Sequence, residues 1–279
     1  MSAHATAPRY QGPSALGGDV RRFFNLTYVL AVTEWKLRFF GSALGYLWSL
    51  VRPLLFFGVL YTIFTQVLNF GGEVRYYPVY LLASVILFTY FGEVTGGCLT
   101  SLVNRENLLR KIRFPRLVIP MSVALNSLFN LGMNLIAVFV FIFLQGVEPR
   151  WTWFELPLLI FVLVVFATGI GMLLSALYVR FRDVSPIWEV CQQVLFYGSP
   201  ILYVASNYPP KVQALALCNP IAVVLTQMRH AVLDPSAPTA AAAIGGAPRL
   251  LIPLAIVVVV FAFGFWVFRR EAPRIAENL

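Results

Sequence analysis

The residues of this chain that could do chemistry are mainly arginines and lysines, and their arrangement favours anion binding over catalysis. Lys36, Arg38 and Arg52 lie close together in the sequence, just before and just inside a long apolar stretch. Guanidinium and ammonium groups bind carboxylates and phosphates through charge-assisted hydrogen bonds. These three residues therefore predict an anion site. The alternative for Arg52 is a side chain that only extends its charge from an apolar segment to water.

The histidines and cysteines predict no metal site and no catalytic centre. His4 and His230 are far apart, and Cys98, Cys191 and Cys218 have no CxxC spacing. A structural metal site needs several such ligands close together. The sequence also contains no GxxxxGK[ST] motif, the loop with which many proteins hold nucleotide phosphates. We expect no cofactor in this chain and no nucleotide site of its own.

The composition indicates that a membrane surrounds these residues. Of the 279 residues, 59% are hydrophobic and only 12% are charged, a mixture too apolar for a soluble domain. A helix needs about 20 apolar residues to cross a bilayer. Glu189, Gln192 and Gln193 interrupt one of the apolar stretches. Counting that stretch, six spans are predicted, at 44–68, 78–102, 117–144, 156–179, 184–204 and 250–268.

The basic residues predict how these spans are oriented. Cytoplasmic loops of membrane proteins are rich in Lys and Arg. With six spans, 16 of the 21 basic residues fall on one side, and the other side holds Arg75, Arg150, Lys211, Arg229 and Arg249. The sequence thus predicts a multi-pass plasma-membrane protein with both termini in the cytoplasm. Its positive charge is explained by topology, so we expect membrane lipid and no nucleic acid among its partners.

Segments outside the spans complete the predicted fold. Residues 1–19 are polar and rich in Gly, Pro and Ala, which predicts a disordered cytoplasmic tail, and 20–38 predicts an amphipathic helix in the cytoplasmic interface. Before the last span, 209–217 and 220–233 predict two short helices dipping into the outer leaflet, and the Ala-rich stretch after them a flexible loop. The predicted fold class is an all-α integral membrane protein with a single transmembrane domain, 20–279.

The loop between the second and third spans is short and strongly basic. It reads NRENLLRKIRFPR over 104–116, and Pro115 is expected to end its helix. A short cytoplasmic helix with an apolar stripe fits the docking of a soluble motor protein. The alternative is an ordinary positive loop that only sets topology. The residues of this docking segment are Arg105, Leu108, Leu109, Arg110, Lys111, Ile112 and Arg113.

Polar residues inside the spans have two interpretations each. Charged side chains are costly in a bilayer and face a bundle interior or water, so Glu93 and Glu189 either line a polar path or pair with other helices. Asn126, Asn130 and Asn134 share one helical face. They either join helices by hydrogen bonds, which we favour, or line a passage. A run of small residues predicts close helix packing: Ala167, Gly171 and Ser175.

Aromatic residues make up 15% of the chain. Aromatic faces stack on the apolar C–H edges of sugar rings, so an aromatic passage would let a long glycan slide through. Together with Glu93, the residues predicted to line such a channel are Tyr61, Phe64, Tyr90, Phe91, Phe196 and Tyr197. The alternative is the aromatic belt found at membrane interfaces.

Five stretches follow one another along the chain: EWKLRFFGSALGYLWSLVRPLL (34–55), NLLRKIRFPRLVIP (107–120), RDVSPIWEVCQQVLFYGSPILY (182–203), NPIAVVLTQMRHAV (219–232) and FRREAPRIAENL (268–279). In this order they resemble the permease subunits of polysaccharide ABC exporters of the ABC-2 type. They cover much of the chain from about residue 25 to its end. The family often has Arg-Tyr-Arg where this chain has Arg38-Phe39-Phe40, so one basic group expected beside the anion site is absent.

The resemblance implies a transport subunit that is not itself an enzyme. It implies a homodimer that works with two copies of a separate ABC ATPase, which would hold ATP and Mg²⁺ and dock on 104–113. The cargo implied is a lipid-linked polysaccharide, such as an O-antigen, a teichoic acid or a galactan, exported across the bacterial inner membrane. Its diphosphate would meet Lys36, Arg38 and Arg52.

Three other functions stay open at this point. An ABC-2 exporter of a drug or of another lipid would share the fold. A polyprenyl-phosphate-dependent membrane transferase would need cytoplasmic acidic residues to hold a metal, and these are sparse in this sequence. A purely structural membrane scaffold would need no ATPase partner.

Overall fold

The computed structural model describes residues 20–39, 45, 47–68, 74–106, 109 and 115–272, and this part of the chain is helical, with no strand. The predicted tail at 1–19 lies outside the described residues. Five helical stretches are long and apolar enough to cross a membrane. They are α2 (Leu47–Thr62) with the π-helical turn η1 (Ile63–Val67), α3 (Tyr77–Asn104), α5 (Val118–Leu144), η2 (Trp151–Phe154) with α6 (Glu155–Arg180), and η5 (Ala247–Leu250) with α11 (Leu251–Glu271). These helices match five of the six predicted spans to within three residues, apart from the added turn η2, which begins the fourth stretch five residues before the predicted 156.

The remaining predicted span, 184–204, forms a shorter helix. Helix α7 (Val184–Gly198) has 15 residues, about 22 Å at the rise of an α-helix, which is less than the ~30 Å of a bilayer's hydrocarbon core. It stops where Ser199, in an extended conformation, precedes Pro200. Proline disfavours helical backbone at the residue before it, so the apolar run continues past Pro200 without the helix.

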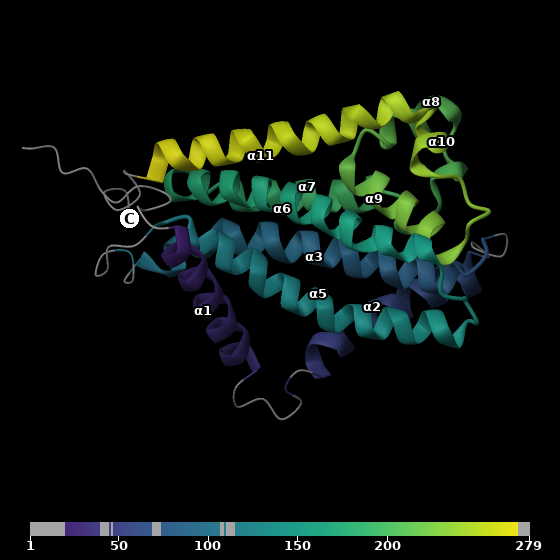
Figure 1. The fold of residues 1–279 in the computed structure, drawn as a ribbon, viewed down its shortest axis with the longest axis horizontal. Coiled ribbons are helices and arrows are strands. Elements are labelled where there is room, and N and C mark those ends of the chain that lie inside the picture. The colour runs from purple at the N-terminus through teal and green to yellow at the C-terminus, as the bar shows by residue number, and fades with distance from the viewer. Residues whose placement is uncertain are drawn as a thin grey trace, which may run out of the picture.

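Helices α3 and α6 form the centre of the bundle (Figure 1). Helix α3 packs against α5 and α6, and α6 packs against α11 on another side. The side chains of Tyr80, Tyr90 and Phe91 on α3 are almost inaccessible. Helix α2 is peripheral by contrast, since only Pro53 and Phe57 of its sixteen residues are buried. The described part of the chain thus has a packed core of spans, with α2 loosely attached at its edge.

Small residues bring α6 close to both of its neighbours. A Cβ atom at Gly264 of α11 would lie 2.1 Å from the carbonyl oxygen of Gly169, and one at Gly171 would lie 2.9 Å from Cβ and Sγ of Cys98 on α3. Ala167 and Ser175 are fully buried on the same helix. This confirms the predicted small-residue packing of the fourth span, because a larger side chain would hold the helices apart.

The two ends of the bundle differ in charge and in structure. The basic end contains the end of α3, the start of α5 and the end of α11. Helix α1 (Val20–Phe39) packs across α5 and is steeply inclined to the spans (Figure 1). Helix α1 buries Phe23, Thr27 and Ala31, which recur every four residues on one face. The arginines found at this end are Arg21, Arg22, Arg105, Arg116, Arg180, Arg182, Arg269 and Arg270.

The opposite end is closed by short helices. The predicted helices at 209–217 and 220–233 are found as α8 (Pro210–Ala216) and as α9 (Pro220–Met228) with the π-helical turn η4 (Arg229–Leu233), after a short turn, η3 (Ala205–Asn207). The prediction of a flexible loop for the Ala-rich stretch, 236–248, was wrong, because this stretch contains a short helix. There, α10 (Ala240–Ile244) begins at a Thr239 side chain that accepts from the backbone N–H of Ala242 and ends at Gly245 with φ 93°, a cap that glycine favours.

Candidate functional site

Two asparagines of α5 fasten the inclined helix α1 to the spans. The Asn126 side-chain nitrogen donates to the backbone oxygen of Ala31 at 3.3 Å. The indole N–H of Trp35 donates to Asn130 Oδ1 at 3.1 Å, and Asn130 Nδ2 donates to Glu93 Oε2 of α3 at 3.0 Å. At Asn126 and Asn130 the row of asparagines on α5 therefore joins helices, as predicted, and Glu93 is part of the same junction.

A second polar contact lies next to the first, nearer the basic end. The guanidinium of Arg105 donates through Nη2 to a carboxylate oxygen of Glu34, and the two form an ion pair. Their side chains are 20% and 25% exposed, so the pair is largely shielded from water. Arg105 directly follows the last residue of α3. The pair therefore ties α1 to the point where the second span leads into the docking segment.

The docking segment itself is only partly described. Leu108, Arg110, Lys111, Ile112 and Arg113 lie outside the described residues. Leu109 is buried in a cluster with Phe23 of α1 and Phe268 of α11. Its backbone N–H bonds to the Arg105 carbonyl at 3.0 Å, which is a helical turn, and this turn places the side chain inward. Leu109 was predicted on the docking surface, but in this structure it anchors the segment from within.

The predicted anion-binding residues are all at the surface. Lys36 and Arg38 are exposed in the last turn of α1, and Arg52 is exposed in the first turns of α2. Residues 40–44 and 46, which join the two helices, lie outside the described part. The structure thus leaves these three cations accessible, and it places Lys36 and Arg38 just beyond Glu34 on the same helix.

The predicted channel residues divide into two groups. Tyr61 on α2, Phe64 on η1 and Phe196 on α7 are half-buried, and Tyr197 is exposed. Phe196 connects α7 to two other helices, because its ring lies 6.0 Å from that of Phe56 on α2 and 5.2 Å from that of Phe88 on α3.

Tyr90 and Phe91, by contrast, are buried inside the subunit. The ring of Phe91 stacks on Phe166 of α6 at 5.7 Å and contacts Trp188 of α7 at 6.2 Å. Phe91 could therefore line a passage only after α7 moves away from α3.

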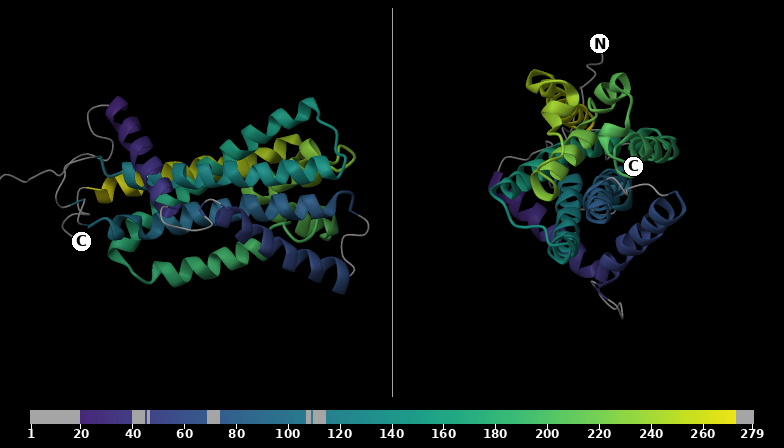
Figure 2. Two further views of the ribbon diagram at one scale, coloured as in Figure 1. Left: turned by 90° about the horizontal axis from the view of Figure 1, so that it is seen from below. Right: turned by 90° about the vertical axis from the view of Figure 1, so that its right-hand side faces the viewer.

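Helix α7 lies with α2 on one flank of the bundle, over α3 (Figure 2). None of its residues is buried. Its inner side is held by hydrogen bonds to Thr95 Oγ1, from Trp188 Nε1 at 3.2 Å and from Gln192 Nε2 at 3.0 Å. Its outer side exposes Glu189 and Gln193. Polar groups on the outside of a membrane helix are costly in lipid, so this face is suited to a protein or water neighbour.

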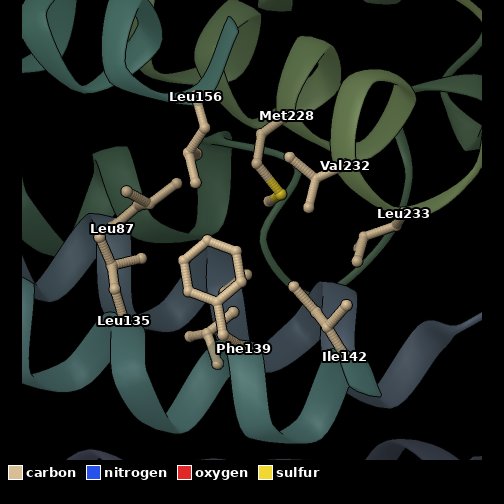
Figure 3. Close-up of a pocket in the computed structure, with 10 residues that line it drawn as sticks. Leu87, Leu135, Phe139, Ile142, Leu156, Met228, Val232 and Leu233 are labelled. Carbon is tan, nitrogen blue, oxygen red and sulfur yellow. The ribbon is translucent and has the colours of Figure 1, made fainter. Parts of the chain in front are cut away.

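A small pocket between α3, α5, α6, α9 and η4 is not a substrate site. All of its ten lining residues are apolar, Leu87, Phe139 and Met228 among them (Figure 3). Its volume of about 10 Å³ is about the least that can hold a single water molecule. A glycan or a diphosphate needs polar partners and far more room, so the surfaces described above are the better candidates.

Comparison with known proteins identifies the family. The family model described as ABC-2 type transporter matches residues 25–233, which is most of the chain. The match runs from α1 through η4 and includes the Glu34–Arg105 pair, the docking segment and α7. This chain belongs to the ABC-2 type transporter family.

Several members of the family that are similar to this chain carry descriptive names. An O-antigen export system permease protein RfbA from Klebsiella pneumoniae is 30% identical over 207 residues, covering 74% of this chain and 79% of that protein. A protein of the same name from Myxococcus xanthus is 28% identical over 189 residues, covering 68% and 72%. The polysialic acid transport protein KpsM from Escherichia coli is 23% identical over 207 residues, covering 73% and 80%.

Sequence reasoning missed one residue of this ABC-2 subunit that the structure makes prominent. Glu34 was not singled out from the sequence, yet it pairs with Arg105, 71 positions later. A signal was present, because a lone carboxylate between Arg22 and Lys36 on a helix expected at a basic surface would be expected to seek a cation.

Proposed function

We propose that this chain is the transmembrane subunit of an ABC exporter that moves a lipid-linked polysaccharide, such as an O-antigen, a teichoic acid or a galactan, across the plasma membrane. The observation that carries the proposal is the similarity, over about three quarters of the chain, to permeases named for O-antigen export and polysialic acid transport. The family does not by itself select the cargo, and these names supply its class.

The proposed topology has six spans, with both termini in the cytoplasm. The short α7 would be the fifth span, extended by the apolar residues that follow Gly198. The basic end of the bundle would face the cytoplasm, because arginine-rich ends are retained there. The short helices α8 to α10 would then lie at the outer surface, where they shape the exit.

The proposed assembly is a dimer of this chain with two ATPase subunits. The flank made by α2 and α7 supports a partner at that position, since it exposes Glu189 and Gln193 as well as apolar side chains. A second copy would cover these polar groups or enclose them in a polar passage. ATP and Mg²⁺ would be held by the ATPase subunits, which would contact 104–113.

The proposed path begins at the end of α1. The diphosphate of the polyprenyl carrier would bind Lys36, Arg38 and Arg52, whose exposed charges suit phosphate oxygens. The glycan would then pass along α2 and α7 beside Tyr61, Phe64, Phe196 and Tyr197. Phe91 would join the lining only if α7 separates from α3, because its ring contacts Trp188 of α7. Tyr90 is buried and Glu93 is bonded to Asn130 of α5, so these two would join it only if the bundle itself rearranges.

Reconstitution tests this proposal directly. Proteoliposomes containing this chain and the ATPase that purifies with it should export a lipid-linked glycan when ATP is supplied, and ATPase-inactive complexes should not. Loss of co-purification when Leu108 becomes Glu, with the yield of folded protein unchanged, would locate the docking at this segment. Transport of drugs or simple lipids, with none for any lipid-linked glycan, would contradict the proposed cargo.

A further inference from the structure

The inner side of α7 presents one aromatic and one amide side chain to α3. Trp188 and Gln192 are four residues apart, so they share a face of the helix. Trp188 Nε1 donates to Thr95 Oγ1 at 3.2 Å, and Gln192 Nε2 donates to the same oxygen at 3.0 Å. Gln192 Nε2 also lies 3.3 Å from the backbone oxygen of Gly92. A single threonine hydroxyl of α3 is therefore the shared acceptor for both side chains of α7.

The hydroxyl of Thr95 uses its full hydrogen-bonding capacity. Its Oγ1 donates to the backbone oxygen of Phe91 at 2.8 Å and accepts the two bonds from α7. A hydroxyl has one donor and two acceptor lone pairs, so all three are engaged. Thr95 is completely buried, whereas none of the residues of α7 is buried. A fully bonded, water-excluded hydroxyl thus fastens a helix whose own side chains remain accessible.

The two side chains that Thr95 holds are of the kinds that bind sugars. The face of an indole ring stacks on the apolar C–H edges of a sugar ring, and indole and amide N–H groups donate to sugar hydroxyls. A sugar hydroxyl is the same functional group as the threonine side chain, an alcohol that donates one hydrogen bond and accepts two. Thr95 therefore occupies the position that a hydroxyl of a glycan could take beside Trp188 and Gln192.

This similarity makes the cost of moving α7 dependent on the cargo. If α7 leaves α3 with nothing in exchange, two N–H donors lose their acceptor inside the membrane, and a polar group without a partner is costly there. A cargo rich in hydroxyl groups replaces the lost acceptor. A drug or a lipid tail that lacks such groups does not.

We propose that Trp188 and Gln192 are glycan-binding residues of the transport path, and that Thr95 holds them until a glycan hydroxyl takes its place. The inference rests on the proposed function and adds residues that were not among the predicted channel residues. The same movement uncovers Phe91, whose ring contacts that of Trp188 at 6.2 Å.

A cysteine on α3 beneath α7 reports whether the two helices separate. Gly92→Cys places a thiol against Gln192, because a Cβ atom there would lie 3.6 Å from Gln192 Nε2, which is an ordinary contact. A Cys191→Ser, Cys218→Ser background leaves the buried Cys98 as the remaining native thiol. The rate of modification by N-ethylmaleimide is measured in the full complex with its ATPase in nanodiscs.

Two comparisons of this rate test the role of the Thr95 hydroxyl. Without glycan, adding Thr95→Val should raise the rate about five- to tenfold, because two hydrogen bonds between helices are lost. Thr226→Val is the matched control and should not change it, since Thr226 is buried in α9 and also donates to a carbonyl one turn before it. With Thr95 intact, lipid-linked glycan extracted from membranes that contain this chain should raise the rate, and undecaprenyl diphosphate without sugars should not.

ATP-driven glycan export separates a binding role from a merely structural one. Gln192→Leu removes a bond to Thr95 and also removes a partner of the sugar, so export should fall about fivefold, the effect of one lost hydrogen bond. Thr95→Val loosens α7 but keeps both sugar partners, so this variant should still export. If Gln192 only held α7 in place, the two variants would change export alike.

The outcomes distinguish this inference from the proposed function. The inference is overturned if Thr95→Val leaves the modification rate unchanged, if the sugar-free carrier raises the rate as much as the lipid-linked glycan, or if Thr95→Val and Gln192→Leu lower export equally. In each of these cases export by the unmodified complex still supports the proposed function. If the unmodified complex exports no lipid-linked glycan, the proposed function fails, and the glycan-binding role fails with it.

Discussion

At the residue scale, one amide holds three helices together. Asn130 accepts a hydrogen bond from Trp35 of α1 and donates one to Glu93 of α3. Only Asn and Gln side chains can do both at once from neighbouring atoms of one amide. In an apolar bundle this makes Asn130 a junction, and it explains how a helix inclined to the others can be fixed in position.

Replacing Asn130 by Ala should therefore destabilise the protein more than replacing Asn134. Asn130→Ala removes both bonds and leaves the Glu93 carboxylate without its amide donor, at a cost of about 1 kcal/mol for bonds of this kind in membranes. This corresponds to a melting temperature lower by about 2–4 °C. Thermal unfolding of the purified protein in detergent measures it.

The matched control is one turn away on the same stripe. Asn134 is also buried on α5, but its side-chain oxygen has no partner in the described structure. Asn134→Ala should change the melting temperature less. An equal fall in melting temperature for both variants would mean that the two hydrogen bonds of Asn130 add no stability beyond that of any buried amide.

The sequence predicted that these asparagines join helices, but it did not predict which residues they bond to. Four-residue spacing placed Asn126 and Asn130 on one face, and the preference for joining helices follows from the cost of bare polar groups in lipid. The partners Trp35 and Glu93 lie 95 and 37 positions away. Pairing over such separations depends on how the helices pack, which a single sequence does not encode locally.

At the scale of elements, the tightest contact is that between α6 and α11. The backbone of Gly169 faces Gly264, and a Cβ atom at Gly169 would lie 2.7 Å from the Cα of Phe261. Neither neighbour is the flexible end of a side chain, so the helices themselves would have to separate. This contact secures the last span to the core, since only a small part of that span is buried.

Gly264→Ala should thus weaken the bundle although alanine favours helices. The added methyl group would push α11 from α6 and cost about 1–3 kcal/mol, the usual penalty of overpacking. A lower yield of monodisperse protein in size-exclusion chromatography and a lower melting temperature are expected. Gly132→Ala on α5, where a Cβ atom meets nothing within 4 Å, should be neutral or slightly stabilising. A harmless Gly264→Ala would show that α11 can shift freely.

Hydropathy predicted the spans well and the breaks in them less well. Apolar runs end where a helix leaves the membrane, so α3 and α5 could be placed almost to the residue. The end of α7 at Gly198 depends on Pro200, a local backbone rule hidden inside an apolar run. The helix α10 was missed because its Ala-rich composition suggested a loop, although Thr239 and Gly245 are suitable caps.

At the scale of the whole molecule, the subunit has one flank that is incomplete. Helices α2 and α7 lie on the same side of α3 (Figure 2) and bury few of their own residues. An apolar exposed helix is ordinary in lipid, and α11 is an example. What distinguishes α7 is that polar Glu189 and Gln193 share its outer side with Val190 and Val194. Lipid alone would leave those polar groups unsatisfied.

Cysteine cross-linking distinguishes a protein neighbour from lipid at this flank. In a Cys191→Ser background, which removes the native exposed thiol of α7, Val190→Cys should form disulfide-linked dimers in oxidised membranes. The reason is geometric, since a disulfide needs two Cα atoms within about 7 Å, and two copies meeting along α7 bring equivalent residues together across a two-fold axis. Gel mobility without reducing agent reports the linked fraction.

Val259 of α11 supplies the matched control, because it is also a valine and is as exposed as Val190, at 63% against 59%. Val259→Cys in the same background should remain monomeric on the gel if α11 faces lipid. Cross-linking through both positions would indicate random collisions, and cross-linking through Val259→Cys alone would move the dimer interface to α11. In the second case Glu189 and Gln193 would have to be covered by something other than a second copy, and the path proposed between α2 and α7 would lose its second wall.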